Sequence, residues 1–216
     1  GTISTFAESS HQPGKFWAGT DDGLVHLSTD GGKHWENVTP KDLPEWAYIY
    51  CIETSTHDLD ALYISATRYK LDDYRPYLYK SMDGGKNWKN ICGNYPENEI
   101  SRVIREDPKN PGLLFVGSET GIFFSHNDGA NWNRLGGNFP VVPVYDLKIK
   151  DDEMVVATHG RSFWILDDLN PVRESSRFKA EDDFHFFPPK STFRRTLNWS
   201  TNLFMGDGKN YSPAFG

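Results

Sequence analysis

Residues 81–88 read Ser-Met-Asp-Gly-Gly-Lys-Asn-Trp, and this short pattern occurs twice more in the chain. Residues 28–35 read Ser-Thr-Asp-Gly-Gly-Lys-His-Trp, and residues 125–132 read Ser-His-Asn-Asp-Gly-Ala-Asn-Trp. The copies recur at intervals of 53 and 44 residues, and such a recurrence is typical of a fold that is built from repeated units.

Each repeat contains four short β-rich segments that are separated by turn residues. In the second repeat the first three segments are 48–54, 62–65 and 77–80, and the fourth begins at Trp88. No stretch of a dozen residues has the apolar period of a helix. Four strands in a unit of this length predict the blade of a β-propeller. A β-sandwich would not repeat one turn at the same place in every unit, and a β-helix has a much shorter period.

The repeats predict an all-β chain of about four four-stranded antiparallel blades within a larger propeller. The expected boundaries are 1–42, 43–96, 97–140 and 141–190 for the blades and 191–216 for an irregular C-terminal extension. The fourth unit has no Trp-terminated turn, so its last strand is expected at 183–187, after a polar connection over 172–182. Because blades stack through apolar faces, a segment of four blades is expected to form a homodimer or a larger assembly.

The repeated turn has a local structural explanation. An Asp in a tight turn accepts hydrogen bonds from backbone N–H groups, and a Gly adopts a positive φ there without strain. The Trp that ends the pattern is expected to bury its ring between adjacent sheets. A catalytic or ligand-binding role is the alternative, but equivalent turns in successive blades point to separate places. The residues expected to staple these turns are Ser28, Asp30, Gly32, Trp35, Ser81, Asp83, Gly85, Trp88, Ser125, Asn127, Asp128, Gly129 and Trp132.

Composition argues against several classes of function. The 23 Lys and Arg residues are outnumbered by 30 Asp and Glu, so the net charge is −7 and nucleic acid is not expected as a partner. No apolar run approaches the roughly 20 residues of a membrane span. No His-Glu-x-x-His or Cys-x-x-Cys spacing occurs, so neither a metal nor another cofactor is predicted. Cys51 and Cys92 are expected on separated strands, as free thiols.

Strand order predicts where a ligand site would lie. Turns between third and fourth strands lie near the rim at one end of the blades. Loops between second and third strands lie at the opposite end, near the axis, and the loop over 67–75 is long, as binding loops often are. The candidate catalytic acids are Asp21, Asp22, Asp72, Asp73 and Glu119. The candidate ligand-binding residues are Arg68, Tyr69, Tyr74, His159, Arg161 and Trp164.

Two carboxylates beside aromatic rings would suit a glycoside hydrolase, which needs them about 5–5.5 Å or 6.5–9.5 Å apart. One of the pair should then have a raised pKa. The alternative is structural, because Asp-Asp-Gly and Glu-Thr-Gly are good turn sequences. In that case His159 or Arg161 would pair with an acid of the neighbouring blade.

The three turns resemble the Asp-box, or bacterial neuraminidase repeat, of sialidases, sortilin-type receptors and xyloglucan-active glycoside hydrolases. Residues 18–23, 102–108 and 156–168 are similar to segments of large secreted bacterial proteins with glycosyl-hydrolase-like or sortilin-like repeats. This resemblance implies a propeller fold and a secreted, periplasmic or cell-surface location. The Arg-Ile-Pro signature of sialidases is absent. Xyloglucan-active relatives take their two catalytic acids from two propellers, so this chain would supply one at most.

The resulting hypothesis is a carbohydrate-interacting propeller segment whose partner is a polysaccharide or oligosaccharide. The chain opens with Gly-Thr-Ile-Ser-Thr, without a Met or a signal peptide, and we expect a fragment of a larger protein. We expect no complete active site in it, and any enzyme activity would be glycoside hydrolysis. The alternatives are a sortilin-like module that binds protein or peptide, and a purely structural scaffold.

Overall fold

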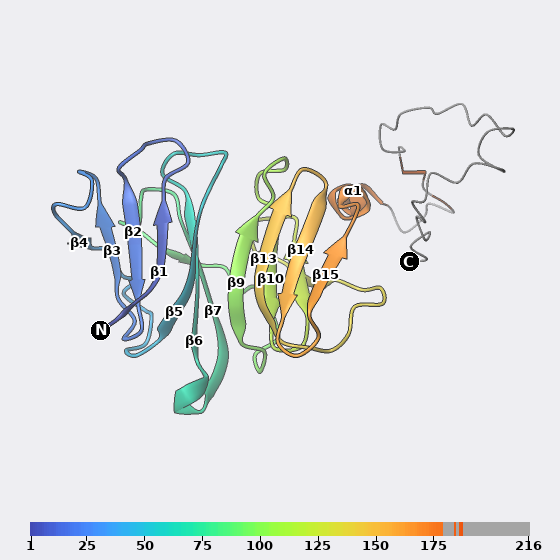
Figure 1. Cartoon of the computed structure of the whole chain (residues 1–216), viewed down its shortest axis with the longest axis horizontal. Helices are drawn as coiled ribbons and strands as arrows, with labels where there is room; N and C mark the ends of the chain where they lie inside the picture. Colours follow the sequence, from blue (N-terminus) through green and yellow to red (C-terminus); the bar gives the residue numbers. More distant parts are fainter. Residues whose placement is uncertain (179–183, 185, 188–216) are drawn as a thin grey trace, which may run out of the picture. The chain divides into compact units, whose positions relative to one another are not determined.

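The first three repeats each fold into a four-stranded antiparallel sheet, and the fourth forms a three-stranded sheet (Figure 1). The computed structural model describes residues 1–178, 184, 186 and 187. The chain divides into two units, residues 1–182 and 183–216, and all four sheets lie in the first unit. Strand order within each sheet follows the sequence, so neighbouring strands are joined directly along the chain.

The strands occupy the segments that the repeat predicts. The first sheet contains β1 (Ile3–Glu8), β2 (Phe16–Thr20), β3 (Val25–Ser28) and β4 (Glu36–Asn37). The second contains β5 (Tyr48–Thr54), β6 (Leu62–Arg68), β7 (Asp73–Ser81) and β8 (Lys89–Asn90). The third contains β9 (Ser101–Glu106), β10 (Leu114–Ser118), β11 (Ile122–Ser125) and β12 (Asn133–Arg134). The fourth contains β13 (Val144–Lys150), β14 (Glu153–Thr158) and β15 (Phe163–Leu166).

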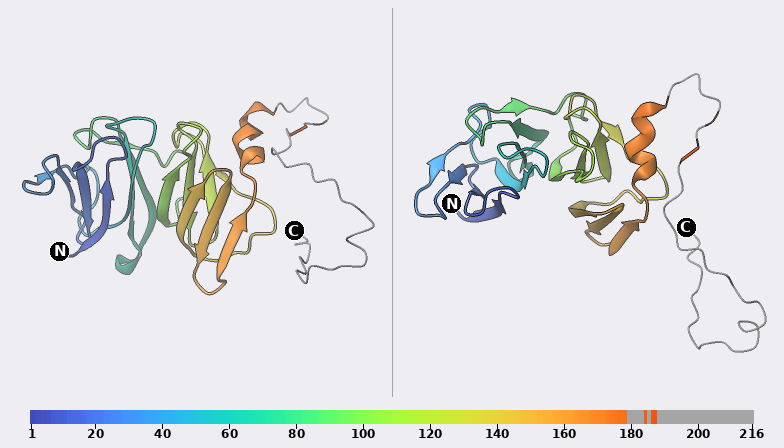
Figure 2. Two further views of the ribbon diagram at one scale, coloured as in Figure 1. Left: turned by 45° about the horizontal axis from the view of Figure 1, so that its top comes forward. Right: turned by 90° about the horizontal axis from the view of Figure 1, so that it is seen from above.

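Successive sheets pack together through their first strands. β1 contacts β5, β5 contacts β9 and β9 contacts β13, and the four sheets follow one another in an arc (Figure 2). Trp17 and Ile49 belong to the apolar core between the first two sheets. Phe115 and Val144 belong to the core that joins the later sheets. The chain is therefore an all-β set of consecutive propeller blades, as the repeat predicts.

Small residues in the second strands allow this close packing. At Gly19 an added Cβ would lie 2.5 Å from Cγ2 of Ile49, and at Gly117 it would lie 2.6 Å from Cγ1 of Val144. Ile49 and Val144 are on the first strand of the following sheet in each case. Ser65 has the equivalent place in the second sheet, and its hydroxyl donates a hydrogen bond to a backbone carbonyl of β9. A larger side chain at these positions would push two blades apart.

A β-bulge interrupts the first strand of each sheet beside this contact. In all four sheets the pairing of the first strand with the second shifts register at the equivalent place. The residues at this position are Ser4, Tyr50, Arg102 and Tyr145. A bulge leaves one residue out of the ladder and redirects its side chain.

A helical segment in the connection after β15 was not expected. α1 (Asn170–Glu174) begins with Pro171 in its first turn, and η2 (Ser175–Arg177) follows it. The buried Arg173 anchors α1, because its Nε donates to Asp107 Oδ2 at 2.9 Å. Two turns are too short to show an apolar period, so the sequence pattern does not indicate them.

Two further expectations concern the chain after residue 182. Of the fourth strand predicted at 183–187, residues 183 and 185 lie outside the described residues, and so does the whole extension predicted at 191–216. Phe184, Phe186 and Phe187 are described and belong to no strand. The rings of Phe184 and Phe186 meet edge to face, with their centroids 5.7 Å apart.

The repeated turns join the third strand of a sheet to its fourth, and their own side chains close them. In the second copy Ser81 Oγ donates to Asp83 Oδ1 at 2.8 Å, and the same carboxylate oxygen accepts the Asn87 N–H at 2.8 Å. Asp30 accepts equivalent bonds in the first copy, and Asn127 Oδ1 does so in the third. The backbone N–H of Asn87 holds the pKa of Asp83 below its usual range, so the carboxyl stays ionised.

The Trp that ends the second and third turns reaches the preceding sheet, whereas Trp35 of the first turn stays half-exposed on its own sheet. Trp88 Nε1 donates to the Val38 carbonyl at 2.6 Å, and Trp132 Nε1 donates to the equivalent Ile91 carbonyl at 2.8 Å. Trp35 belongs to the first sheet and donates to a carbonyl of its own turn at 3.0 Å. Trp132 is 4% exposed, whereas Trp35 is 41% exposed. The second and third turns thus join one sheet to the sheet before it.

We expect Trp132→Phe to lower the free energy of unfolding by about 1–3 kcal/mol, because it leaves the Ile91 carbonyl without its donor in a buried site. Trp35→Phe is the matched control. The same chemical change on a half-exposed ring should cost about 0.5 kcal/mol or less. Urea unfolding followed by circular dichroism measures both changes. Equal losses in the two variants would contradict a role for Trp132 in joining sheets.

Candidate functional site

A pocket of about 470 Å³ lies at the end of the blades where second strands turn into third strands. We call it the aromatic pocket. Its aromatic side chains are Trp46, Tyr48, Tyr50, Tyr69 and Tyr145, and its other lining residues are Asp21, Thr67, Arg68, Lys70, Leu71 and Arg102. They come from the four successive blades and from the linker between the first two, and Tyr145 lies on β13 of the fourth blade. The volume is in the range of small-molecule binding sites.

Arg102 is the centre around which the aromatic rings gather. It is 5% exposed, and its Nε and Nη2 donate to Glu119 Oε2 at 2.9 and 2.7 Å. The guanidinium carbon lies 4.5 Å from the centroid of Tyr145, 5.5 Å from that of Tyr69 and 5.6 Å from that of Tyr50. Each ring face attracts the cation, and the cation in turn fixes the rings. The bulges supply three of these groups, since Tyr50, Arg102 and Tyr145 are all bulge residues.

The long loop of the second blade forms one wall of the aromatic pocket. It contains η1 (Tyr69–Leu71), and the β6–β7 hairpin that carries it extends past the neighbouring strands (Figure 1). Asp73 holds the loop closed. Its carboxylate accepts hydrogen bonds from Arg75 Nε at 2.9 Å, from Tyr77 OH at 2.6 Å and from Arg68 Nη1 at 2.9 Å. These donors, Arg75 first, hold the pKa of Asp73 well below its usual range.

Trp46 lies on the linker between the first two blades, with a strained backbone. Its φ is 64°, a value that a bulky residue rarely adopts, and its side chain is 64% exposed. The backbone N–H of Trp46 donates to the Asp22 carbonyl at 3.2 Å, which ties the linker to the β2–β3 loop. A Cβ on Gly23 would lie 3.0 Å from the Ala47 carbonyl, so the loop and the linker pack closely. Such strain is frequent at ligand sites.

The five candidate acids have different surroundings. Asp21 lines the aromatic pocket, and its Oδ1 accepts the Thr2 N–H at 2.6 Å. Asp22 is outside the lining and accepts a hydrogen bond from the Thr20 hydroxyl, which lowers its pKa. The remaining three are Asp72, an exposed residue with a left-handed backbone that ends η1; Asp73, held in the loop; and Glu119, paired with Arg102. Asp21 is the one acidic residue in the described lining of the aromatic pocket.

The candidate binding residues divide into two groups. Arg68 and Tyr69 line the aromatic pocket, and the His159 ring stacks on Tyr145 with the centroids 5.1 Å apart. Tyr74, Arg161 and Trp164 are outside the lining. The indole of Trp164 donates to the Arg161 carbonyl at 3.1 Å and packs edge to face on Phe139.

Sequence reasoning missed six aromatic and basic residues of the lining: Trp46, Tyr48, Tyr50, Lys70, Arg102 and Tyr145. A signal for part of this set was present. Tyr48 and Tyr50 alternate on a predicted first strand, so they share a face, and first strands lie nearest a propeller axis. Arg102 and Tyr145 follow one residue into the corresponding strands of the next two blades.

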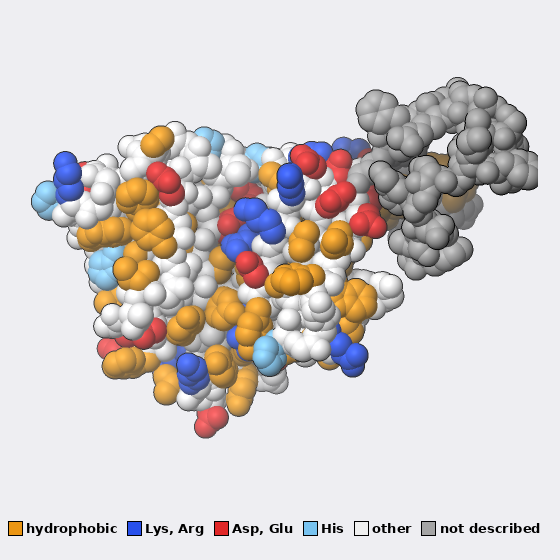
Figure 3. All heavy atoms as spheres, in the orientation of Figure 1, with side chains coloured by type: hydrophobic (Ala, Val, Ile, Leu, Met, Phe, Trp, Pro, Cys, Tyr) orange, Lys and Arg blue, Asp and Glu red, His pale blue; other side chains and the backbone are white. Residues whose placement is uncertain are grey.

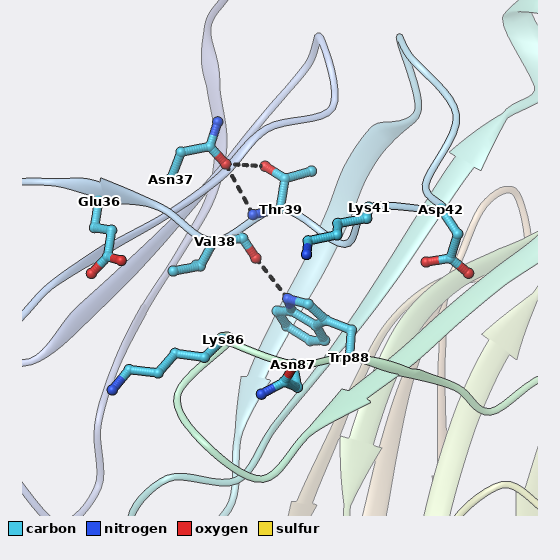
Figure 4. Close-up of a pocket in the computed structure, with 10 residues that line it drawn as sticks. Glu36, Asn37, Val38, Thr39, Lys41, Asp42, Lys86, Asn87 and Trp88 are labelled. Atoms are coloured by element: carbon cyan, nitrogen blue, oxygen red, sulfur yellow. Dashed lines mark hydrogen bonds between the residues drawn. The ribbon is translucent and has the colours of Figure 1, made fainter.

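A second pocket, of about 330 Å³, lies at the opposite end of the blades, between the first two sheets (Figure 4). It is lined by the end of the first repeat, including Glu36 and Lys41, and by the second repeated turn, including Lys86. The Trp88 indole points to Val38 across it, where their hydrogen bond joins the two sheets. The walls are polar chain segments and exposed charges, and we interpret this pocket as a junction between blades.

A shallow groove of about 420 Å³ runs along β1, β5, β9 and β13 and shares Tyr50 and Tyr145 with the aromatic pocket. On this face a group of Lys and Arg side chains lies near the middle, bordered by acidic side chains (Figure 3). Arg105 donates from Nη1 to Glu53 at 3.1 Å and from Nη2 to Asp146 at 2.7 Å, so it links three blades. Burial raises the pKa of Glu53 to about 7, although the Arg105 charge opposes the shift.

Three further features of the described residues concern a metal site, a disulfide bond and a membrane span. Among these residues no group of three or more His, Cys, Asp or Glu side chains is placed to hold a metal ion. Cys51 on β5 and Cys92 beyond β8 are free thiols. The helices in the described part are a few residues long, so none of them could cross a membrane.

Known proteins share this fold. No family model and no curated protein sequence matches the chain. Among solved structures, the GH74 xyloglucanase from Xanthomonas campestris matches with a TM-score of 0.61 and 16% identity over 78% of this chain. YCF48 bound to D1 peptide matches with a TM-score of 0.59 and 16% identity over 77% of this chain. YCF48 from Cyanidioschyzon merolae matches with a TM-score of 0.58 and 18% identity over 89% of it.

These matches cover only part of the known proteins. The chain spans 29% of the xyloglucanase, 51% of the peptide-bound YCF48 and 58% of the Cyanidioschyzon protein. At such identities they show a shared propeller fold and no more.

The raised pKa of Glu53 predicts a pH effect on stability. A carboxyl that binds its proton more tightly in the folded chain than in the unfolded chain stabilises the fold at low pH. This stabilisation is lost as the pH rises from about 4.5, the pKa of the carboxyl in the unfolded chain, to about 7, its pKa in the folded chain. Glu53→Gln removes this titration. The wild-type free energy of unfolding should therefore fall relative to that of Glu53→Gln between pH 5 and pH 8, by on the order of 1–3 kcal/mol.

Urea unfolding at pH 5, 6, 7 and 8 measures this difference. Glu36→Gln is the control, because it removes the same charge from an exposed position on β4. A parallel pH dependence of wild type and Glu53→Gln would contradict the burial argument.

Proposed function

We propose that this chain is a carbohydrate-binding propeller segment and that the aromatic pocket is its binding site. The observation that carries the proposal is the gathering of five aromatic side chains from successive blades around one pocket. The flat faces of Tyr and Trp suit the apolar faces of sugar rings, and their polar edges remain near water. The exposed indole of Trp46 and the ring of Tyr69 lie on the two loops that border the pocket.

Binding rather than hydrolysis is the activity that we propose for this segment. Glycoside hydrolysis needs two carboxylates at the scissile bond, one of them held protonated. In the described lining Asp21 is the single acid, Glu119 is committed to Arg102, and hydrogen bonds keep the pKa of Asp73 low. A second carboxylate would have to come from another part of the complete protein, which fits the partial coverage of the GH74 xyloglucanase.

Peptide binding is the second candidate. The likeness to YCF48 bound to D1 peptide favours it, because a propeller of this fold is there described with a peptide. Rings of Tyr and buried Arg are also frequent at protein interfaces. For either ligand we propose a site of action outside the cytoplasm, supported by the resemblance of the repeats to secreted proteins.

A glycan array and a peptide array probed with the 216-residue chain distinguish the two candidates. We expect oligosaccharides to be retained. Trp46→Gly and Tyr69→Ala should each weaken this binding at least about tenfold, because each removes a ring that would stack on the ligand. The Gly substitution suits the positive φ at residue 46.

Trp35→Ala is the matched control, since it removes an exposed indole from the opposite end of the blades. Its glycan binding should equal that of the wild type. Retention of peptides with no glycan retained would replace the proposal by the second candidate.

A further inference from the structure

We propose that the aromatic pocket selects saccharides that carry a carboxylate, which Thr67, Arg68 and Lys70 bind. This inference rests on the carbohydrate function proposed above and names the class of sugar. Its basis is a pair of buried polar atoms that have no partner within the described chain, together with the ammonium group of Lys70.

Thr67 Oγ1 and Arg68 Nε are buried and make no hydrogen bond. They are two of four such side-chain atoms in the described part of the chain, and both residues line the aromatic pocket. Thr67 is 1% exposed. Leaving a buried donor or acceptor unpaired costs about 1–3 kcal/mol, so two such atoms in one pocket point to a ligand that completes them.

The end of β6 explains how consecutive residues both reach the pocket. Side chains of neighbouring strand residues normally point to opposite faces. Thr67 is still paired with Tyr48 of β5, whereas Arg68 is the last residue of β6 and its φ of −126° and ψ of 22° lie outside the extended region. The alternation of the strand therefore ends between these two residues. The Arg68 guanidinium is held in place because its Nη1 donates to Asp73 at 2.9 Å.

Both of the atoms that lack a hydrogen-bond partner can act as donors. Nε of Arg68 can only donate, and the Thr67 hydroxyl can donate as well as accept. A carboxylate accepts up to four hydrogen bonds and matches an arginine N–H with a charge-assisted bond. A neutral sugar hydroxyl would accept a weaker hydrogen bond from the same atoms, because it carries no negative charge to attract the guanidinium.

One cation of the lining favours an anion as well. Three side chains of the lining are basic and one, Asp21, is acidic, but Arg68 is paired with Asp73 and Arg102 with Glu119. Lys70 is the third basic side chain. Lys70 takes part in none of the ion pairs described among residues 1–178, and its Nζ lies 6.0 Å from the ring centroids of Tyr48 and Tyr69. Its charge is therefore available at the mouth of the pocket.

Isothermal titration calorimetry on the 216-residue chain tests the proposal with two matched pairs of probes. The first pair is tetragalacturonate and its fully methyl-esterified form, which share a skeleton and differ in charge. The second is 3′-sialyllactose and lactose, which place the carboxylate on a different sugar. We expect the acid of at least one pair to bind about tenfold or more tightly than its neutral partner, and to weaken between 50 and 300 mM NaCl.

Thr67→Val is the decisive variant. Removing an unpaired buried hydroxyl while keeping the shape should leave the melting temperature unchanged or raise it. The same change should weaken binding of the acidic sugar severalfold, because a ligand contact is lost. Lys70→Met should weaken it at least threefold, and Lys86→Met, which removes the same charge at the opposite end of the blades, should not.

The outcomes separate this inference from the function on which it rests. Equal binding of acidic and neutral sugars, or unchanged affinity in Thr67→Val, would overturn the carboxylate selectivity and leave carbohydrate binding intact. If none of the four probes binds and the array retains no neutral glycan, carbohydrate binding itself is overturned. A tighter response to acidic peptides than to any sugar would assign the charged site to a peptide.

Discussion

The close approach of each first strand to the second strand of the preceding blade is the constraint on which the rest of the structure depends. Gly19 and Gly117 have no room for a Cβ, and Ser65 uses its hydroxyl to bond the crossing backbone. Because the strands touch there, the first strands lie side by side and bring their side chains to a shared surface. The repeated turns at the other end then hold the outer strands against the preceding sheet.

The aromatic pocket follows from this packing. Beside the close contact the first strand of each sheet has a bulge, and the bulges place Tyr50, Arg102 and Tyr145 toward one another. The three residues belong to three blades and are far apart in the sequence, yet the cation and the rings are within contact distance. A single arginine therefore positions aromatic groups that no local sequence pattern connects.

Features that depend on residues close together in the sequence could be predicted, whereas features that depend on contacts between distant strands could not. The turns, the strand positions and the end of the blades that carries the pocket depend on patterns a few residues long, and the repeat reveals them. Arg68 and Tyr69 could be named because they lie in a long loop. The face that Tyr50 shares with Tyr48 is visible in the sequence, but the meeting of Tyr50 with Tyr145 is not, because a bulge depends on the pairing partner in another strand. α1 was missed for another reason, since buried Arg173 anchors it through a distant carboxylate.

The bulges also have a consequence for how such a propeller can diversify. A bulge places one residue outside the ladder and redirects its side chain, so each blade can direct one side chain to the surface that the first strands share. Here the four equivalent positions hold Ser4, Tyr50, Arg102 and Tyr145, a small polar group, two phenols and a cation. The same backbone device thus carries a different chemical group in each blade, so the identity of four residues decides which chemistry the fold places at equivalent positions.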